Sequence, residues 1–208
     1  MIQTPISKSQ ELRKDLALIA DMIEPGSRVL DIGCGQGELL QYLSDAKNID
    51  ARGIEISQAG VNLCVSQGLS VVQGDADRDL INYPEKSFDV VILSQTIQAT
   101  QKPHAVLEQM LRIGDKVIIS IPNFGYWRVR LQLMFKGTMP LTTSLPESWY
   151  ETPNIHFCTI RDFENLCCDL NVTIEQQLAL DSRGYSKLVS SSRMLMNFFG
   201  EKAIFVLS

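Results

Sequence analysis

Short apolar runs alternate with amphipathic segments through the first half of the chain. Each run has the length of a strand, and the segments between the runs repeat their apolar residues at the spacing of a helix. The predicted strands lie at 28–32, 51–56, 69–73, 88–93 and 116–121. Alternation of strand and helix with short connections predicts a parallel sheet with right-handed crossovers, so the fold class is α/β.

A lead-in helix is predicted before the first strand. Residues 7–24 place their apolar side chains on one helical face. Ser7 and Gln10 have the spacing of a capping box, and Pro25 follows as a stop signal. We expect this helix to cover one side of the sheet.

The C-terminal part of the chain predicts one more helix and two strands. Thr159 and Asp162 have the spacing of a helix cap. The runs 172–180 and 203–207 predict strands six and seven, and no obvious long crossover separates them. A hairpin is therefore expected, with the last strand antiparallel. The residues between the two strands hold either a short helix or a loop.

Glycines at alternate positions follow the first strand. Gly33, Gly35 and Gly37 let the backbone turn sharply and approach a ligand closely. Asp31, at the strand end, would repel a phosphate and would hold an ammonium group. The spacing also differs from a dinucleotide fingerprint, because Glu38 stands where the third glycine of that motif belongs.

A second acid ends the second predicted strand. Glu55 lies 24 residues after Asp31, about where an open α/β sheet brings the second strand beside the first glycine turn. A carboxylate at this place accepts hydrogen bonds from both hydroxyls of a ribose. The sequence therefore predicts a nucleoside-type ligand that carries an ammonium group.

The segment 31–37 resembles motif I of the class I S-adenosylmethionine-dependent methyltransferases. The resemblance implies a Rossmann-like fold with a seven-stranded, mostly parallel sheet, an antiparallel last strand and helices on both faces. It also implies S-adenosylmethionine or S-adenosylhomocysteine as the cofactor. The expected cofactor-binding residues are Asp31, Gly33, Cys34, Gly35, Gly37, Glu55, Ile56, Asp75, Ala76, Ser94 and Gln95.

Two of these positions carry open alternatives. In the superfamily, an acid at the place of Asp75 meets the adenine amino group, but this aspartate also has the context of a residue that caps its own turn. Ser94 and Gln95 follow the fourth strand, where they are candidates for the methionine end of the cofactor or for a substrate.

Composition narrows the class of protein. The 208 residues are 45% hydrophobic, which predicts a single domain over 1–208. A net charge of −5 and a pI near 5.1 disfavour binding to nucleic acid. The chain has no run of 18 apolar residues and no signal-peptide pattern, so we expect a cytoplasmic protein without a membrane span.

The cysteines indicate free thiols rather than a metal site. Five cysteines form no Cys-x-x-Cys pair, and only two histidines accompany them, so no metal is expected. Cys34 lies at a helix N-terminus, which would lower its pKa, yet a loop thiol beside a cofactor is more often a small filler.

An insertion at about 122–158 interrupts the alternation and holds both tryptophans. Such a segment after a strand usually covers a site or meets a partner. Its aromatic and basic residues would allow base stacking, but the interleaved apolar residues favour a half-buried helix. His156, Tyr150 and Asn154 are its candidates for polar contact with an acceptor or partner. The catalytic residues are unknown, with His156 and Tyr150 as candidates; His156 is either a general base or a hydrogen-bonded structural histidine.

Segments 94–100, 121–127 and 149–160, together with the glycine loop, resemble the MetW family of methionine biosynthesis proteins. The resemblance covers roughly residues 26–180. It implies a methyltransferase-like partner that supports homoserine O-acyltransferase, the MetX enzyme, and no methyl acceptor is established for the family.

Three functions remain open at this stage. The chain is a cofactor-binding partner that activates the acyltransferase, a methyltransferase acting on a small cytoplasmic metabolite, or an interaction module whose site has lost its ligand. The intact acids and glycines count against the third. Whether the protein is itself an enzyme stays open. The insertion is the expected docking surface, with Trp127 or Trp149 as its test positions.

Overall fold

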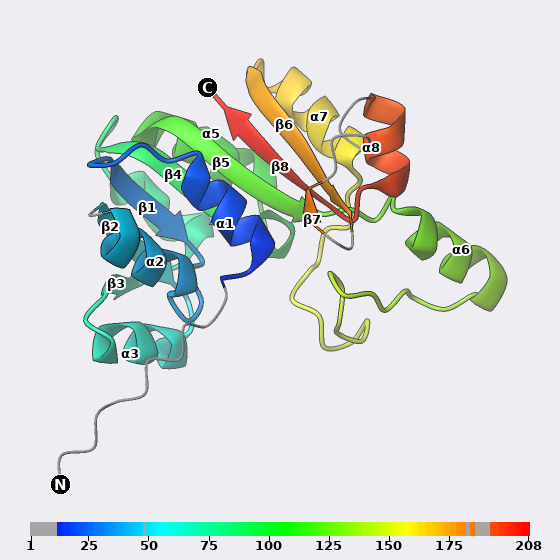
Figure 1. The fold of residues 1–208 in the computed structure, drawn as a ribbon, viewed down its shortest axis with the longest axis horizontal. Helices are drawn as coiled ribbons and strands as arrows, with labels where there is room; N and C mark the ends of the chain where they lie inside the picture. The colour runs from blue at the N-terminus through cyan, green and yellow to red at the C-terminus, as the bar shows by residue number, and fades with distance from the viewer. Residues whose placement is uncertain (1–11, 48, 182–183, 186–191) are drawn as a thin grey trace, which may run out of the picture.

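The computed structural model describes residues 12–47, 49–181, 184–185 and 192–208. Its centre is an eight-stranded sheet with strand order β3-β2-β1-β4-β5-β8-β6-β7 (Figure 1). The strands are β1 (Arg28–Ile32), β2 (Asp50–Glu55), β3 (Ser70–Gln73), β4 (Phe88–Ser94), β5 (Gly114–Pro122), β6 (Ile174–Asp181), β7 (Gly184–Tyr185) and β8 (Lys202–Leu207).

Strand pairing confirms the expected class I methyltransferase topology. Strands β1 to β5 pair in parallel, whereas β8 lies antiparallel between β5 and β6. The sheet has one strand more than the seven expected, because β7 pairs with the end of β6 through Leu180 and Tyr185. A two-residue strand is too short to show a periodic pattern in the sequence.

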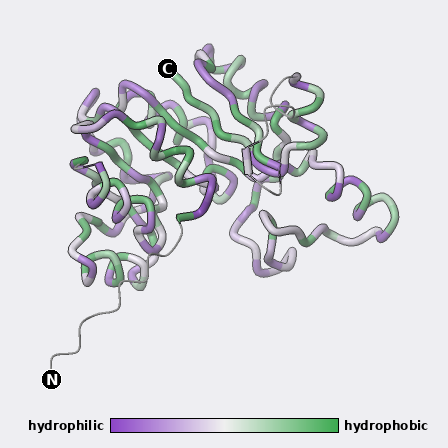
Figure 2. The backbone as a smooth tube through the Cα atoms, viewed as in Figure 1, coloured by the Kyte–Doolittle hydropathy of each residue, from purple (hydrophilic) through white to green (hydrophobic). Residues whose placement is uncertain are grey.

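Helices cover both faces of the sheet. The helices α1 (Lys14–Asp21), α2 (Glu38–Lys47) and α3 (Gln58–Ser66) pack with β1 on one face. The helices α5 (Pro103–Ile113), α7 (Ile160–Asp169) and α8 (Arg193–Phe199) pack on the other face. Hydrophobic segments run through the central strands (Figure 2). Burial on both faces explains why those strands are almost continuously apolar.

The helix predictions hold to different extents. Helix α1 begins at Lys14, later than expected, because Arg13 is extended with ψ 137°. The Ser7–Gln10 capping box lies outside the described residues. The capping box at Thr159 and Asp162 is confirmed at the start of α7. The segment between the last two predicted strands was expected to hold either a short helix or a loop, and the structure has a short helix there, α8.

The insertion forms helix α6 (Trp127–Lys136), which projects away from the sheet, and a long loop (Figure 1). The sequence predicted a half-buried helix, but Val129 is the one buried residue of α6. Met134 and Phe135 are 68% and 75% exposed. The helix is present as expected, and its apolar side is largely open to solvent.

Three shorter elements are described besides these helices and strands. They are α4 (Ala76–Asp79), η1 (Leu80–Asn82) and η2 (Ile97–Ala99). Because β1 to β5 run in parallel, their carboxyl ends meet at one edge. That edge carries the glycine loop.

Candidate functional site

The glycine loop joins β1 to α2 in a left-handed backbone conformation. The φ angles of Gly33, Gly35 and Gly37 are +70°, +57° and +81°. The amide of Gly33 donates to the carbonyl of Ile54 at 2.8 Å, which fixes the loop to β2. A Cβ atom on Gly35 would meet nothing within 4 Å, so this part of the loop faces open space. The loop leaves room for a ligand against its backbone.

At Gly37, the side on which a Cβ atom would lie is filled by packed side chains. A Cβ atom there would lie 2.5 Å from Leu69 Cδ1 and 2.9 Å from Cys64 Sγ. Gly68 has nearly the same φ, +80°, and open space around it. We expect Gly37→Ala to lower the free energy of unfolding by about 1–3 kcal/mol more than Gly68→Ala does. Urea unfolding measures the difference, and equal losses would show that backbone strain alone is responsible.

Glu55 holds the loop through its carboxylate. Its Oε2 accepts a hydrogen bond from the amide of Gly35 and its Oε1 accepts one from the amide of Ser57, both at 2.8 Å. The residue is 7% exposed. Each oxygen keeps a further lone pair, so the carboxylate is able to accept hydrogen bonds from a ligand as well.

Asp31 is a buried acid beneath the same loop. It is 4% exposed. Burial raises the pKa of Asp31 to about 7, the negative charge of Glu55 adds to the rise, and the Arg13 guanidinium opposes it. A cationic group beside this carboxylate would stabilise its ionised form and so offset the effects of burial and of the Glu55 charge. The site therefore favours a ligand with a positive charge.

Two cavities flank the loop. The first, of about 320 Å³, is lined by Arg13, Leu16, Asp31, Gly33, Cys34, Gly35, Gln36, Glu38, Leu39 and Ser94. The second, of about 160 Å³, includes Gly33, Ile56, Asp75, Ala76, Asp77 and Thr96 among its lining residues. The structure thus brings most of the expected cofactor-binding residues to one edge. Glu55, Gly37 and Gln95 line neither cavity.

Asp75 and Asp77 organise the second cavity. Asp75 is the N-cap of α4 and accepts a hydrogen bond from the amide of Asp77, so it does cap its own turn. The carboxylate of Asp77 accepts hydrogen bonds from the amides of Gln101 and Lys102. Asp77 thereby ties the segment after η2 to α4, a role that the sequence analysis missed.

Gln95 fastens α1 over the first cavity. Its amide Nε2 donates to Asp15 Oδ2 at 2.6 Å. Asp15 is buried and also pairs with Arg13 and Lys202. Burial raises its pKa, but these cations and the Gln95 amide outweigh that effect and hold the pKa below its ordinary value. Asp15 and Arg13 were not predicted from the sequence, because Asp15 meets Gln95 and Lys202, which lie far along the chain, and Arg13 acts through Asp15.

Cys34 is not an activated thiol. The sequence placed it at a helix N-terminus, where a lowered pKa was expected. Burial instead raises the pKa of Cys34, and the negative charge of Asp31 adds to the rise. The prediction of a lowered pKa was wrong, because loss of hydration and a nearby carboxylate both disfavour the thiolate. The thiol packs beside Gly53, and whether Cys34 also contacts a cofactor stays a prediction.

Neither His156 nor Tyr150 lines the cavities at the loop. His156 lines a separate pocket of about 290 Å³ with His104 and Cys158, and its amide donates to the carbonyl of Gln98. Tyr150 is 71% exposed beside Trp149. Their part in contacting an acceptor or partner stays a prediction.

Solved structures define the class of the fold. An S-adenosylmethionine-dependent methyltransferase from Mesorhizobium loti matches with a TM-score of 0.67 at 14% identity, over 94% of this chain and 97% of that one. The cyclase SpnF matches with a TM-score of 0.65 at 17% identity, over 92% and 79%. The fold is that of the class I S-adenosylmethionine-dependent methyltransferases.

Sequence relatives give the family. The model of the methionine biosynthesis protein MetW matches residues 13–207. The bifunctional methionine biosynthesis protein MetXA/MetW of Rhodopirellula baltica is 34% identical over 179 residues, 82% of this chain and 29% of that protein. The chain belongs to the MetW family, which supports a role in methionine biosynthesis.

A more distant relative is a methyltransferase. Phosphoethanolamine N-methyltransferase 1 of Arabidopsis thaliana is 31% identical over 105 residues, 47% of this chain and 21% of that protein. The chain thus spans less than a third of the length of these relatives.

Within the described residues, no helix is long and apolar enough to cross a membrane.

Proposed function

We propose that this protein binds S-adenosylmethionine at the glycine loop. The residues fit such a ligand, because the position of a Cβ on Gly35 is open and two buried carboxylates lie beside the loop. Asp31 would hold the ammonium group and Glu55 would accept the ribose hydroxyls. Asp75 would meet the adenine amino group, as the resemblance implies. When bound, the cofactor supplies a sulfonium that is a ready methyl donor.

We further propose that the protein acts as a partner that activates homoserine O-acyltransferase. One observation carries this proposal: the relative from Rhodopirellula baltica joins a MetXA part and a MetW part in one chain. Fusion of two proteins in one chain indicates that they act together. Where the two are separate chains, they would act together by forming a complex.

The exposed apolar side chains of the insertion support a protein partner. Trp149 is 70% exposed, and Leu141, Ile155 and Phe157 are 54–58% exposed. Several exposed apolar side chains within one segment make that segment a candidate interaction surface. Trp127, in contrast, packs against Tyr126 with ring centroids 6.0 Å apart. Trp149 is therefore the better test of docking.

We expect Trp149→Ala to weaken the complex with the acyltransferase by roughly tenfold or more, since exposed aromatic anchors carry much of the binding energy at interfaces. Cofactor affinity is expected to stay unchanged. Ile81→Ala is the matched control, because Ile81 is 69% exposed on η1, outside the insertion. Biolayer interferometry with the acyltransferase of the same organism makes the measurement. Equal affinity of both variants would remove the insertion as the docking surface.

The decisive experiment measures homoserine O-acyltransferase turnover with and without this protein, across a titration of S-adenosylmethionine. A rise in turnover on addition of the protein is the expected result. If turnover depends on the S-adenosylmethionine concentration with the natural sequence but not with Glu55→Gln, the loop site senses the cofactor and controls the acyltransferase. Unchanged turnover together with no stable complex would overturn the proposal.

A second candidate function is methyl transfer to a small metabolite. The complete set of acids and glycines at the loop favours it, as does the match to phosphoethanolamine N-methyltransferase 1. Methyl transfer needs alignment of donor and acceptor and exclusion of water rather than acid–base groups. Formation of S-adenosylhomocysteine with a metabolite extract, abolished in Asp31→Asn, would support this candidate.

A further inference from the structure

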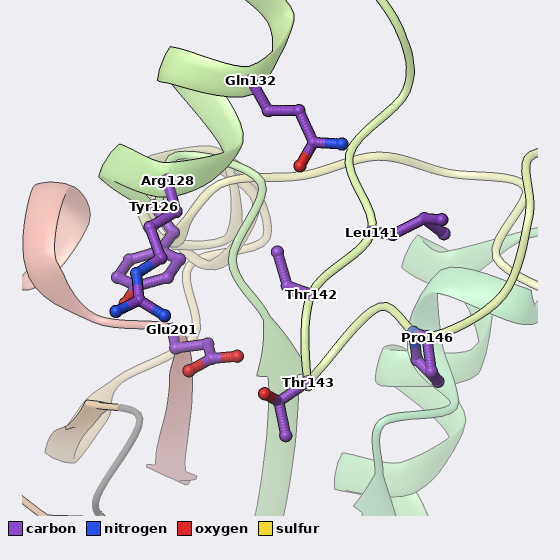
Figure 3. A pocket seen from close by; sticks show the side chains of 8 residues that line it. All are labelled: Tyr126, Arg128, Gln132, Leu141, Thr142, Thr143, Pro146 and Glu201. Atoms are coloured by element: carbon purple, nitrogen blue, oxygen red, sulfur yellow. The ribbon is translucent and has the colours of Figure 1, made fainter.

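A cavity of about 510 Å³ lies apart from the glycine loop, between α6, the loop 141–146 and the start of β8. Its lining residues are Tyr126, Arg128, Gln132, Leu141, Thr142, Thr143, Pro146 and Glu201. Figure 3 shows Arg128 reaching from α6 toward Glu201, with the loop 141–146 as the opposite wall. Neither cavity at the glycine loop shares a lining residue with it.

Glu201 presents one carboxylate oxygen without a described partner. The residue is 5% exposed. The backbone amide and the hydroxyl of Ser144 both donate to Oε1, at 3.2 and 3.1 Å. Across the described ranges of the chain, no hydrogen bond or ion pair reaches Oε2. A largely buried carboxylate that presents a free oxygen to a cavity is able to accept hydrogen bonds from a cationic or hydrogen-bond-donating ligand.

The position of Glu201 is fixed by its backbone. Its carbonyl accepts a hydrogen bond from the amide of Asn123 at 2.9 Å, and its amide donates to the carbonyl of Leu180 at 2.8 Å. It is therefore held between the ends of β5 and β6. A carboxylate on such a rigid support is prepared for binding without rearrangement.

Arg128 supplies the opposite charge at the exposed side of the same cavity. Its guanidinium lies 5.4 Å from the centre of the Trp127 ring. It forms no ion pair with Glu201 or any other acid that the structure describes. The cavity thus carries a largely buried carboxylate and an exposed guanidinium that form no ion pair with each other. Two opposite charges on the lining of one cavity suit a small molecule that carries both charges.

We infer that this cavity binds an α-amino acid, with its ammonium group on Glu201 and its carboxylate on Arg128. The amino-acid side chain would lie among Gln132, Thr142 and Leu141, which offer polar groups and an apolar surface. A guanidinium is well suited to pair with a carboxylate through two hydrogen bonds. This inference does not rest on the proposed function, because it concerns a separate cavity.

Isothermal titration calorimetry with L-serine, L-homoserine and L-methionine tests the inference. Excess S-adenosylhomocysteine is present throughout, so that the glycine-loop site does not contribute heat. We expect at least one of the three to bind. Propanolamine lacks the carboxylate of homoserine, and 4-hydroxybutyrate lacks its ammonium group. Neither compound is expected to bind. Absence of heat with all three amino acids would overturn the inference, and so would equal binding of propanolamine.

Two variants connect binding to the residues. Glu201→Gln keeps an acceptor for Ser144 and removes the charge, and Arg128→Gln removes the cation. Each is expected to weaken binding by roughly tenfold or more. Lys136→Gln, at the far end of α6, is the matched control and should bind normally. If Glu201→Gln fails to fold, Arg128→Gln alone decides. Unchanged affinity in Arg128→Gln would refute the assignment.

Discussion

Replacing Glu55 by glutamine is expected to lower the affinity for S-adenosylmethionine roughly ten- to hundredfold. The carboxylate accepts hydrogen bonds from Gly35 and Ser57, one on each oxygen. An amide has one oxygen, so its NH₂ group would oppose a backbone N–H donor in a buried position. The loop would lose its fixed shape, and the ribose would lose an acceptor.

Calorimetric titration of the variant with S-adenosylmethionine measures this loss. Glu85→Gln is the matched control, because this exposed acid lies in the turn before β4, at the opposite edge of the sheet. The Glu55→Gln protein should also unfold with a free energy lower by about 1–3 kcal/mol. A stability loss without a change in the affinity of the folded protein would contradict a ligand-binding role and leave Glu55 as a support of the loop.

The sheet was predictable because its signals are local. Each of the first five strands is a short apolar run followed by a turn, and the short connections leave little choice other than parallel pairing. The capping box at Thr159 and Asp162 is equally local. Strand β7 was missed because two residues carry no period. The exposure of α6 was missed because apolar residues at helical spacing predict a buried face, and the pattern does not show whether another element packs against it.

The candidate site was predictable as far as the strand ends and the glycines define it. Asp31 and Glu55 follow from their positions alone, since carboxyl ends of parallel strands meet at one edge. The support of α1 did not follow, because the contact between Asp15 and Gln95 joins residues 80 positions apart. The pKa of Cys34 was misjudged for a related reason. The helix terminus is visible in the sequence, whereas burial and the approach of Asp31 require the fold.

Asp31→Asn is expected to have opposite effects on stability and on cofactor affinity. The pKa of Asp31 is raised from 3.8 to about 7, first by burial and then by the charge of Glu55. The folded protein therefore holds a proton that the unfolded chain releases as pH rises above its own pKa. Ionised Asp31 destabilises the fold, and this penalty grows between about pH 4 and pH 7 and is complete above it. Asparagine carries no such penalty.

At about pH 8, the free energy of unfolding of the variant should therefore exceed that of the natural sequence by an amount on the order of a few kcal/mol, and its unfolding temperature should be higher. Both differences should vanish near pH 4. Cofactor affinity is expected to behave in the opposite way. An ammonium group binds the ionised carboxylate, so affinity of the natural sequence should rise as pH passes through about 7, while the variant stays weak throughout.

Thermal unfolding without ligand and titration with S-adenosylmethionine, both at about pH 6 and about pH 8, measure the two effects. Ser94→Ala changes another residue that lines the same cavity and keeps Asp31, so it serves as the control and its affinity should retain the pH dependence of the natural sequence. A variant that is both less stable and weaker in binding at high pH would mean that Asp31 is ionised and paired within the fold. In that case its charge would stabilise the strand edge itself, and the ammonium group of the ligand would need another partner.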